Sequence, residues 1–247
     1  MTGTKAFAHC KTGGVSHFVC RPLEALGLRH GFSDSTQNFV HGEDNASIAE
    51  LCTAYGAATF LNSQQVHGQG LWDLRGLQLG DPALRLLPPK ADAILLRKAV
   101  KLEGKPATIV GIKTADCIPI IVDAGDECAL IHAGWRGLAS ALIPLTLEKL
   151  SRRDRLTLAI GPHAGPECYE VGAEVIAALG EHALIHPRSD GKALLDLGAT
   201  CERMVRALYP EAVIYHSGLC TICGSNLHSY RRDGASSGRN LSYVVLG

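Results

Sequence analysis

Short apolar runs recur along the chain and predict β-strands. These runs are rich in β-branched and aliphatic residues, which suit the pleated surface of a sheet. The predicted strands cover residues 17–20, 59–67, 92–96, 107–113, 117–124, 127–133, 156–161, 212–217 and 242–246.

Four other segments have the pattern of helices: 45–56, Trp135 to about Arg153, 171–182 and 196–210. Asn45 or Ser47 can cap the first helix, and Gly56 can close it. Pro144 predicts that the second helix starts late or kinks, because proline lacks an amide donor. Pro88 and Pro89 predict a loop over residues 80–93, because they lack amide donors and fix φ.

The order of these elements favours an α/β or α+β layered fold, with helices before and after a central run of strands. Between residues 58 and 133 the strands do not alternate with helices, which favours a mixed sheet over a doubly wound parallel one. The sequence contains no internal repeat, low-complexity tract or linker that would divide it. We therefore expect a single domain over residues 1–247.

Composition is that of a globular enzyme, with 46% hydrophobic and 19% charged residues. Lys plus Arg and Asp plus Glu balance at 24 each, so overall charge favours neither nucleic acid nor a membrane surface as a partner. The first residues lack a signal-peptide core, and no run approaches the roughly 18 apolar residues of a membrane span. Nine irregularly spaced cysteines favour reduced thiols or metal ligands over a disulfide framework. We expect a cytoplasmic protein.

Three polar residues interrupt or end predicted strands: His67, Cys117 and His132. Side chains at strand ends can converge on one rim of a sheet. Two imidazoles and a thiolate suit Zn²⁺ and leave a fourth position open, which is the arrangement of catalytic zinc sites. A nucleophile pair of Cys117 and His132 fits the same residues equally well. Separate structural histidines and a buried cysteine are the third reading, and spacing does not separate the three.

The segment "IHAGWRG" is an unusual end for a strand, because His132 is followed by Gly134, Trp135 and Arg136. The turn is either a packing corner or a means of presenting a side chain to chemistry. A helix beginning here would place Arg136 near its N-terminus, where an anion is favoured. A structural salt bridge is the alternative role for this arginine.

The C-terminal segment "LCTICGSNLHSYRRDG" offers a second set of candidates. Cys220 and Cys223 form a CxxC, but a closed zinc site needs four ligands and the sequence has no second CxxC. We predict that they are ordinary thiols, neither a second metal site nor a redox pair. Arg231, Arg232 and Arg239 suit phosphate or carboxylate recognition, with a solvated basic surface as the alternative.

Six segments in this order resemble the YfiH/laccase-domain family, also called the multicopper polyphenol oxidase domain family: "NSQQVHG", "ADAILL", "KTADCIPIIV", "IHAGWRG", "AIGPHAGPECYEVG" and "SYRRDG…SGR". The resemblance runs from about residue 20 to the end. It implies a single-domain α-β-β-α layered fold. It also implies that His67, Cys117 and His132 are metal ligands and catalytic residues, with Zn²⁺, alternatively Cu²⁺, as the cofactor.

The resemblance further implies phosphorolysis of adenosine, inosine and methylthioadenosine, and deamination of adenosine. The expected partners are then a nucleoside and phosphate. A hydrolase that edits peptidoglycan precursors with Cys117 and His132 is the first alternative. A copper-dependent polyphenol oxidase and a non-catalytic zinc module are the others. The oxidase needs many histidine ligands, whereas one three-ligand set is visible.

The chain departs from the family pattern near its N-terminus. Family members carry a "TRxGGVS"-like segment after "HGF", but here "HGFSDSTQNFVHGEDN" lacks both the arginine and the glycine pair. The letters "GGVS" occur upstream, at 13–16. Phosphate would therefore rely on Arg136, Arg231, Arg232 or Arg239.

Overall fold

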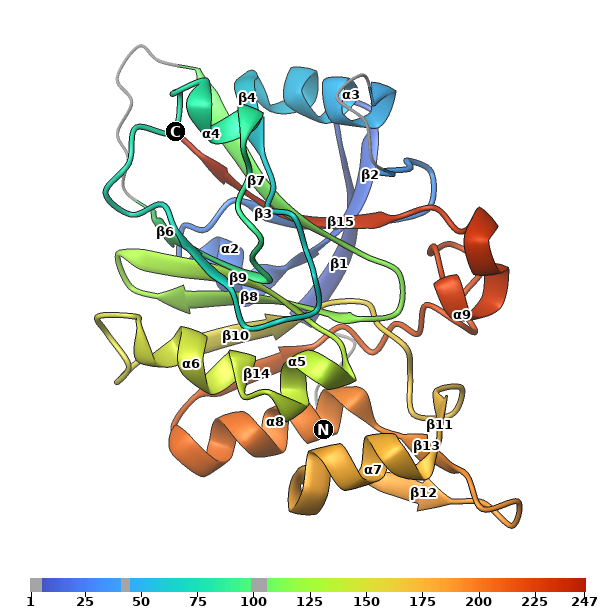
Figure 1. The fold of residues 1–247 in the computed structure, drawn as a ribbon. Coiled ribbons are helices and arrows are strands. Elements are labelled where there is room, and N and C mark those ends of the chain that lie inside the picture. The colour runs from blue at the N-terminus through green and yellow to red at the C-terminus, as the bar shows by residue number, and fades with distance from the viewer. Residues whose placement is uncertain (1–5, 41–44, 99–105) are drawn as a thin grey trace.

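Two six-stranded β-sheets, packed face to face, form the centre of the molecule, and helices cover their outer faces (Figure 1). The computed structural model describes residues 6–40, 45–98 and 106–247. The layers follow the order helix, sheet, sheet, helix, and both sheets are mixed. The predicted α-β-β-α layered fold is confirmed.

The first sheet has the order β1 (Phe7–Thr12), β2 (Val15–Cys20), β3 (His30–Ser33), β15 (Asn240–Leu246), β7 (Ala107–Thr114) and β4 (Ala57–Leu61). The second has the order β14 (Val213–His216), β10 (Thr157–Ile160), β8 (Ile118–Ala124), β9 (Glu127–Ala133), β6 (Ala93–Arg97) and β5 (Leu71–Asp73). A small sheet contains β11 (Glu170–Val171), β13 (Ala193–Leu195) and β12 (Ile185–Pro187).

The outer layers are helical. The helix α3 (Ala46–Tyr55) covers the first sheet. The second sheet is covered by α5 (Trp135–Ala139), α6 (Leu142–Glu148), α7 (Ala173–Leu179) and α8 (Leu197–Leu208). Shorter helices are α2 (Arg21–Ala25), α4 (Ala83–Leu86) and α9 (Tyr230–Asp233), with 3₁₀ turns at Gly180–His182 and Gly234–Ser236.

Alternating side chains of the central strands fill different cores. In β8, Ile120 packs toward the helices and Ile121 toward the other sheet. In β15, Val244 lies between the sheets, whereas Val245 packs on the α3 side. Because a strand presents successive residues to opposite faces, strands covered on both faces become continuous apolar runs. This is why these strands could be predicted from the sequence.

The helix signals are largely confirmed. The Asn45 side chain accepts a hydrogen bond from the Ile48 amide at 3.2 Å, a cap worth about 1 kcal/mol. Gly56 ends α3 in the left-handed conformation, with φ 62°. The predicted helix after Trp135 is divided at Ala141, and Pro144 lies in the first turn of the second piece.

Two predicted segments differ from the structure. The strand predicted over 59–67 ends at Leu61, because Gln65 replaces the backbone ladder with its side chain. Its amide donates to the Lys113 carbonyl and accepts from the Lys113 amide, both at 2.7 Å. The predicted loop over 80–93 contains the short helix α4.

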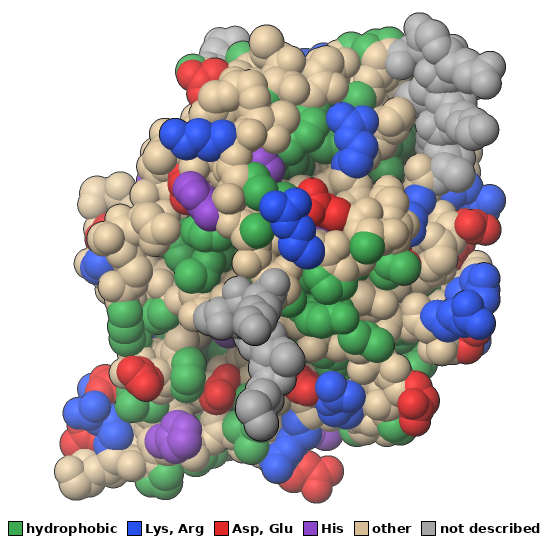
Figure 2. All heavy atoms as spheres, turned by 180° about the vertical axis from the view of Figure 1, so that it is seen from behind, with side chains coloured by type: hydrophobic (Ala, Val, Ile, Leu, Met, Phe, Trp, Pro, Cys, Tyr) green, Lys and Arg blue, Asp and Glu red, His purple; other side chains and the backbone are tan. Residues whose placement is uncertain are grey.

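The surface carries charges of both signs. On the face seen from behind, acidic and basic side chains are interspersed (Figure 2). Within the described residues, every helix is too short or too polar to cross a bilayer.

Candidate metal centre

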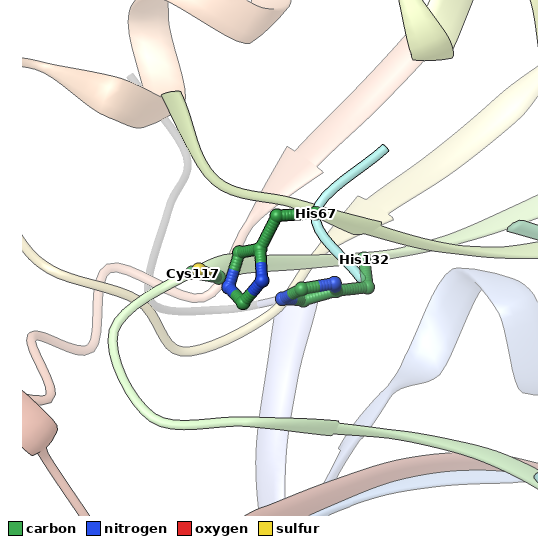
Figure 3. A group of neighbouring side chains, drawn as sticks. All are labelled: His67, Cys117 and His132. Atoms are coloured by element: carbon green, nitrogen blue, oxygen red, sulfur yellow. The ribbon is translucent and has the colours of Figure 1, made fainter. Parts of the chain in front are cut away.

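Three segments bring His67, Cys117 and His132 together at one edge of the second sheet. His67 lies in the loop after β4, Cys117 directly precedes β8, and His132 is near the end of β9. Their side chains point toward one another (Figure 3). One ligand atom from each lies within 4.8 Å of the others, and the imidazole centroids are 4.8 Å apart. We call these three residues the triad.

Gly134 makes this close approach possible. A Cβ atom at Gly134 would lie 2.9 Å from the Cys117 sulfur and 3.6 Å from the His67 ring. The first of these distances is shorter than side chains tolerate. The first glycine of "HAGWRG", Gly134, is therefore required by the triad beside it.

Gly134→Ala is expected to displace the Cys117 sulfur and weaken metal binding at the triad by at least tenfold, while the fold is retained. Gly137→Ala is the matched control, because its Cβ would meet neighbours at ordinary contact distances of 3.5 Å or more. Competition with a chromophoric chelator measures the affinity of both variants. Equal affinities in the two variants would contradict this role for Gly134.

Asp92 supports two members of the triad, and sequence reasoning did not single it out. Its buried carboxylate accepts a hydrogen bond from His132 Nδ1 at 2.8 Å. It also accepts from the amides of His67 at 3.0 Å and Gly68 at 2.7 Å, and from that of Val66 at 3.2 Å. The first bond directs the other ring nitrogen of His132 away from Asp92, as outer partners of metal-binding histidines do. The signal in the sequence was a carboxylate at the start of the apolar run "ADAILL".

Two residues at the site have positive φ angles, which are uncommon outside glycine: His67 at 58° and Asp116 at 94°. Consecutive amides around a left-handed residue form a concave nest for an anion, and the Asp92 carboxylate fills it at His67. At Asp116, one carboxylate oxygen accepts from the Thr221 hydroxyl and the other from the Arg231 amide, both at 2.6 Å. Unusual backbone therefore occurs at the triad and is held by specific hydrogen bonds.

Electrostatics favour an anionic sulfur at Cys117. Burial opposes the thiolate, but the charge of His132 and hydrogen bonds from both triad histidines outweigh it and lower the pKa of Cys117 to about 6. Burial alone would lower the pKa of His132, but the Cys117 thiolate and the Asp92 carboxylate raise it to about 9. For Asp92 itself, its hydrogen bonds outweigh burial and hold its pKa below the usual value. The arrangement thus favours a thiolate, whether it acts as ligand or nucleophile.

The donor set fits a divalent metal. A thiolate and two imidazoles are ligands that Zn²⁺ and Cu²⁺ both accept. Asp92 is the outer-shell partner such a site needs, and Gly134 leaves the space that the sulfur occupies. Three protein ligands leave further coordination positions available.

The triad opens into a cavity of about 420 Å³ that is rich in arginine and aromatic side chains. The guanidinium of Arg136 lies over the Trp135 ring at 4.4 Å, and that of Arg231 over the Tyr169 ring at 4.9 Å. The third arginine of the lining is Arg239, whose guanidinium lies 6.0 Å from the Tyr230 ring. Cationic groups held over aromatic rings thus surround the approach to the triad.

The predicted arginines therefore separate in space. Arg136 and Arg231 line the cavity, whereas Arg232 is absent from its lining. The Arg232 guanidinium donates to the carbonyls of Thr221, Gly224 and Leu227 at 2.7–2.8 Å and pairs with Asp233. Its contacts hold the turn after β14.

The glycine pair near the N-terminus has a structural role. Gly13 and Gly14 form the turn between β1 and β2, with φ angles of 54° and 92°. This two-residue turn with positive φ at both positions is typical of hairpins. Of the stretch that replaces the family's "TRxGGVS"-like segment, residues 41–44 lie outside the described residues.

The expectation for the cysteines needs correction. Cys223 forms a disulfide with Cys168, 55 residues away in sequence. Cys220 is a free thiol. Its sulfur lies within 4.8 Å of the sulfurs of Cys168 and Cys223. The sequence alone did not show a further cysteine near the CxxC. The structure places Cys168 there, in the loop between β10 and β11.

A family model described as multi-copper polyphenol oxidoreductase laccase matches residues 5–247. The chain belongs to this family. A purine nucleoside phosphorylase of Xylella fastidiosa strain Temecula1 is 35% identical over 194 residues, which cover 74% of this chain and 71% of the relative. The adenosine deaminase RL5 of an unknown prokaryotic organism is 34% identical over 150 residues, covering 55% of this chain and 57% of the relative.

The fold of this family member is also found in a solved structure. The crystal structure of YlmD from Geobacillus stearothermophilus aligns with a TM-score of 0.79 at 24% identity, covering 97% of this chain and 98% of that one. The match to the family model confirms the resemblance to the YfiH/laccase-domain family, and this structure confirms the fold.

Proposed function

We propose that this protein is a purine nucleoside enzyme. It would cleave adenosine, inosine or methylthioadenosine with phosphate and would deaminate adenosine, with His67, Cys117 and His132 as its catalytic centre. One observation carries this proposal: the triad opens into a cavity lined by three arginines and by aromatic rings. The names of the relatives, a purine nucleoside phosphorylase and an adenosine deaminase, support the same reading.

The triad residues would hold one Zn²⁺, alternatively Cu²⁺. Such an ion, when bound, acts as a Lewis acid and makes water acidic enough to react near neutral pH. The protein contributes the positions of its ligands: Asp92 orients His132, and the nest around His67 fixes the loop that carries this second imidazole. Deamination needs only a purine and water at this centre.

Phosphorolysis needs an anion site in addition. Arg136, Arg231 and Arg239 would supply it, because guanidinium groups bind phosphate through paired donors. Arg136 is exposed, and within the described part of the chain it makes no ion pair, so it is available to an anion. The aromatic ring of Tyr230, whose side chain lies at the cavity and is 56% exposed as a residue, offers a face for the purine. A cytoplasmic location would give the enzyme access to both substrates.

A single assay tests the proposal. Purified metal-loaded protein is incubated with adenosine, with and without phosphate, and the products are separated by chromatography. We expect inosine in both mixtures and free adenine only where phosphate is present. Absence of turnover of any purine nucleoside, with metal bound, would eliminate the proposal.

Arg136→Ala separates the two reactions. The variant is expected to lose at least tenfold in phosphate-dependent cleavage, while deamination of adenosine changes by less than about threefold, because only phosphorolysis binds the anion. Initial rates across a phosphate titration measure the difference. Arg97→Ala is the control, since this exposed arginine lies at the end of β6 and outside the cavity lining. An equal loss of both activities, with reduced stability, would instead assign Arg136 a structural role.

A second candidate rests on the alignment of Cys117, His132 and Asp92. A thiol of lowered pKa, an imidazole beside it and a carboxylate that orients the imidazole are the parts of a cysteine nucleophile. This arrangement supports a cysteine-dependent hydrolase, and we propose a peptidoglycan precursor as its substrate in this alternative. Activity that survives complete removal of metal, and is abolished by alkylation of Cys117, would favour it. The oxidase has less support, since within the described residues one ligand group contains histidine.

A further inference from the structure

Three cysteines outside the triad meet at a second place in the fold. Cys168 lies in the loop between β10 and β11, and Cys220 and Cys223 lie in the turn after β14. Their sulfur atoms are within 4.8 Å of one another. We call these residues the thiol cluster. In the structure two of its members, Cys168 and Cys223, are joined as a disulfide, and Cys220 is the free third thiol.

The turn that carries two of these cysteines presents backbone amides to sulfur. The Cys220 sulfur accepts from the Cys223 amide at 3.4 Å and from the Gly165 amide at 3.2 Å. Amide donors on the sulfur of a CxxC turn are outer-shell contacts of the kind that stabilise an electron-rich ligand atom. The amide donors to the Cys220 sulfur therefore suit a metal-ligating thiolate, and cysteines that are close only by chance would not need them.

The backbone around the cluster is built for close approach. A Cβ atom at Gly165 would lie 3.1 Å from the Cys220 sulfur, and one at Gly224 would lie 2.6 Å from the Cys220 carbonyl oxygen. Arg232 holds the same turn through the carbonyls of Thr221 and Gly224. These contacts fix the turn without help from the disulfide. The Cys168 amide donates to the Gly165 carbonyl at 3.1 Å, and the Gly165 amide in turn donates to the Cys220 sulfur, so we expect the three sulfurs to stay neighbours when the disulfide is reduced.

A cavity of about 440 Å³ lies beside the thiol cluster, separate from the cavity of the triad. Two histidines line it together with the three cysteines. A Cβ atom at Gly198 would lie 2.8 Å from Nε2 of His163 and 3.3 Å from Nδ1 of His216, so both ring nitrogens face the same space. The other nitrogens of these rings bond the Gly161 carbonyl and the Glu202 carboxylate. The thiol cluster thus faces a cavity in which the imidazole nitrogens of His163 and His216 are available as metal ligands.

We propose that the thiol cluster, once reduced, binds one Zn²⁺ through Cys168, Cys220 and Cys223, and that formation of the Cys168–Cys223 disulfide closes this second metal site. Three thiolates prefer a thiophilic divalent ion such as zinc. Sulfurs bound to one tetrahedral zinc ion are about 3.8 Å apart, which the spacing of the cluster accommodates. The adjacent cavity would supply the fourth ligand. This site is independent of the proposed function, and it replaces the prediction that Cys220 and Cys223 are ordinary thiols.

Closing the site is a two-electron oxidation: a small-molecule disulfide takes up the electrons and leaves as two thiols, while the Cys168–Cys223 bond forms. Opening the site is the reverse two-electron reduction. A phosphine attacks one sulfur of the disulfide, the S–S bond breaks, and water converts the phosphine to its oxide while the two sulfurs leave as thiols. Zinc then displaces the protons of the three thiols.

Cobalt binding tests the proposal, because Co²⁺ occupies zinc sites and each Co–thiolate bond adds charge-transfer absorption. Protein stripped of metal is titrated with Co²⁺ without oxygen, in oxidised form and after reduction with the phosphine. The oxidised protein should bind one equivalent with one thiolate, at the triad. The reduced protein should bind two, with about fourfold stronger charge-transfer absorption, since four thiolates are then engaged. Elemental analysis after zinc loading gives the same count.

Variants assign the second equivalent. Reduced Cys220→Ser and Cys168→Ser are each expected to lose it and to keep the first. Reduced Cys117→Ala should lose the first and keep the absorption of three thiolates. Cys52→Ser, in the distant helix α3, is the matched control and should bind two equivalents. A reduced wild type that binds no more metal than the oxidised protein, or a reduction-dependent equivalent that survives in both cluster variants, would overturn the proposal. Circular dichroism identifies any variant that fails to fold.

Discussion

Cys117→Ala is expected to abolish metal binding at the triad and, with it, turnover of purine nucleosides. The thiolate is the only anionic member of the triad, so two neutral imidazoles would remain to hold a dication. Loss of an outer-shell partner lowers metal affinity by about 10–100-fold, and loss of a ligand should exceed this. Elemental analysis of oxidised, zinc-loaded protein measures occupancy, and the adenosine assay measures turnover.

Cys52→Ala is the control for this experiment. Cys52 is also half-buried, but it lies on α3, in the outer layer of the other sheet. Its variant should bind one equivalent of metal in the oxidised protein, as the wild type does. Full metal occupancy in Cys117→Ala would refute the assignment of the triad, and nucleoside turnover without metal would refute the role of the ion.

Asp92→Asn is expected to have the second largest effect, although Asp92 is not a ligand. The carboxylate accepts from His132 and from three successive amides. An asparagine offers one oxygen in place of two, so its NH₂ group would face donors in a buried site. Leaving such groups unpaired costs about 1–3 kcal/mol, and loss of the outer-shell bond to His132 should weaken metal binding by about 10–100-fold.

Chemical denaturation and metal competition measure the two consequences of Asp92→Asn separately. Asp34→Asn is the matched control: this buried carboxylate also accepts several hydrogen bonds, including those of Ser16 and Thr36 at 2.6 Å, but it directly follows β3 of the first sheet. It should lower the free energy of unfolding by a similar amount while metal affinity stays within about threefold of wild type. The same loss of affinity in both variants would mean that Asp92 acts only through stability.

The fold could be predicted where burial produces a simple pattern. Strands covered on both faces, such as β7 and β8, are continuous apolar runs, and α3 is bounded by Asn45 and Gly56. The short strands β5, β11, β12 and β13 were missed, because elements of two or three residues are too brief to show a period. β1 and β3 were missed as well, because polar residues and a glycine interrupt their apolar pattern. The end of β4 was also misplaced, because the Gln65 side chain imitates a strand pairing and leaves no signal in hydropathy.

The site was predictable to a different degree for each residue. His67, Cys117 and His132 stand at strand ends and in distinctive motifs, so they could be singled out, and the structure brings them together. Asp92 could not be assigned a role, because its effect depends on amides 24–26 residues away in sequence. Arg232 and Arg239 carry the same charge and lie in the same short segment of the sequence. Only the folded backbone decides that the first holds a turn and the second lines the cavity.

Asp116 connects the triad and the thiol cluster through hydrogen bonds. It is the residue before Cys117, and its carboxylate accepts from Thr221, which follows Cys220 directly. The other oxygen accepts from the Arg231 amide, so the same carboxylate also positions the backbone of a cavity-lining arginine. We therefore expect that a displacement of the turn after β14 would also shift the triad and the proposed anion site, because the Asp116 carboxylate is bonded to both segments. Asp116 thus joins three places in the fold: the triad through Cys117, the thiol cluster through Thr221, and the cavity lining through Arg231.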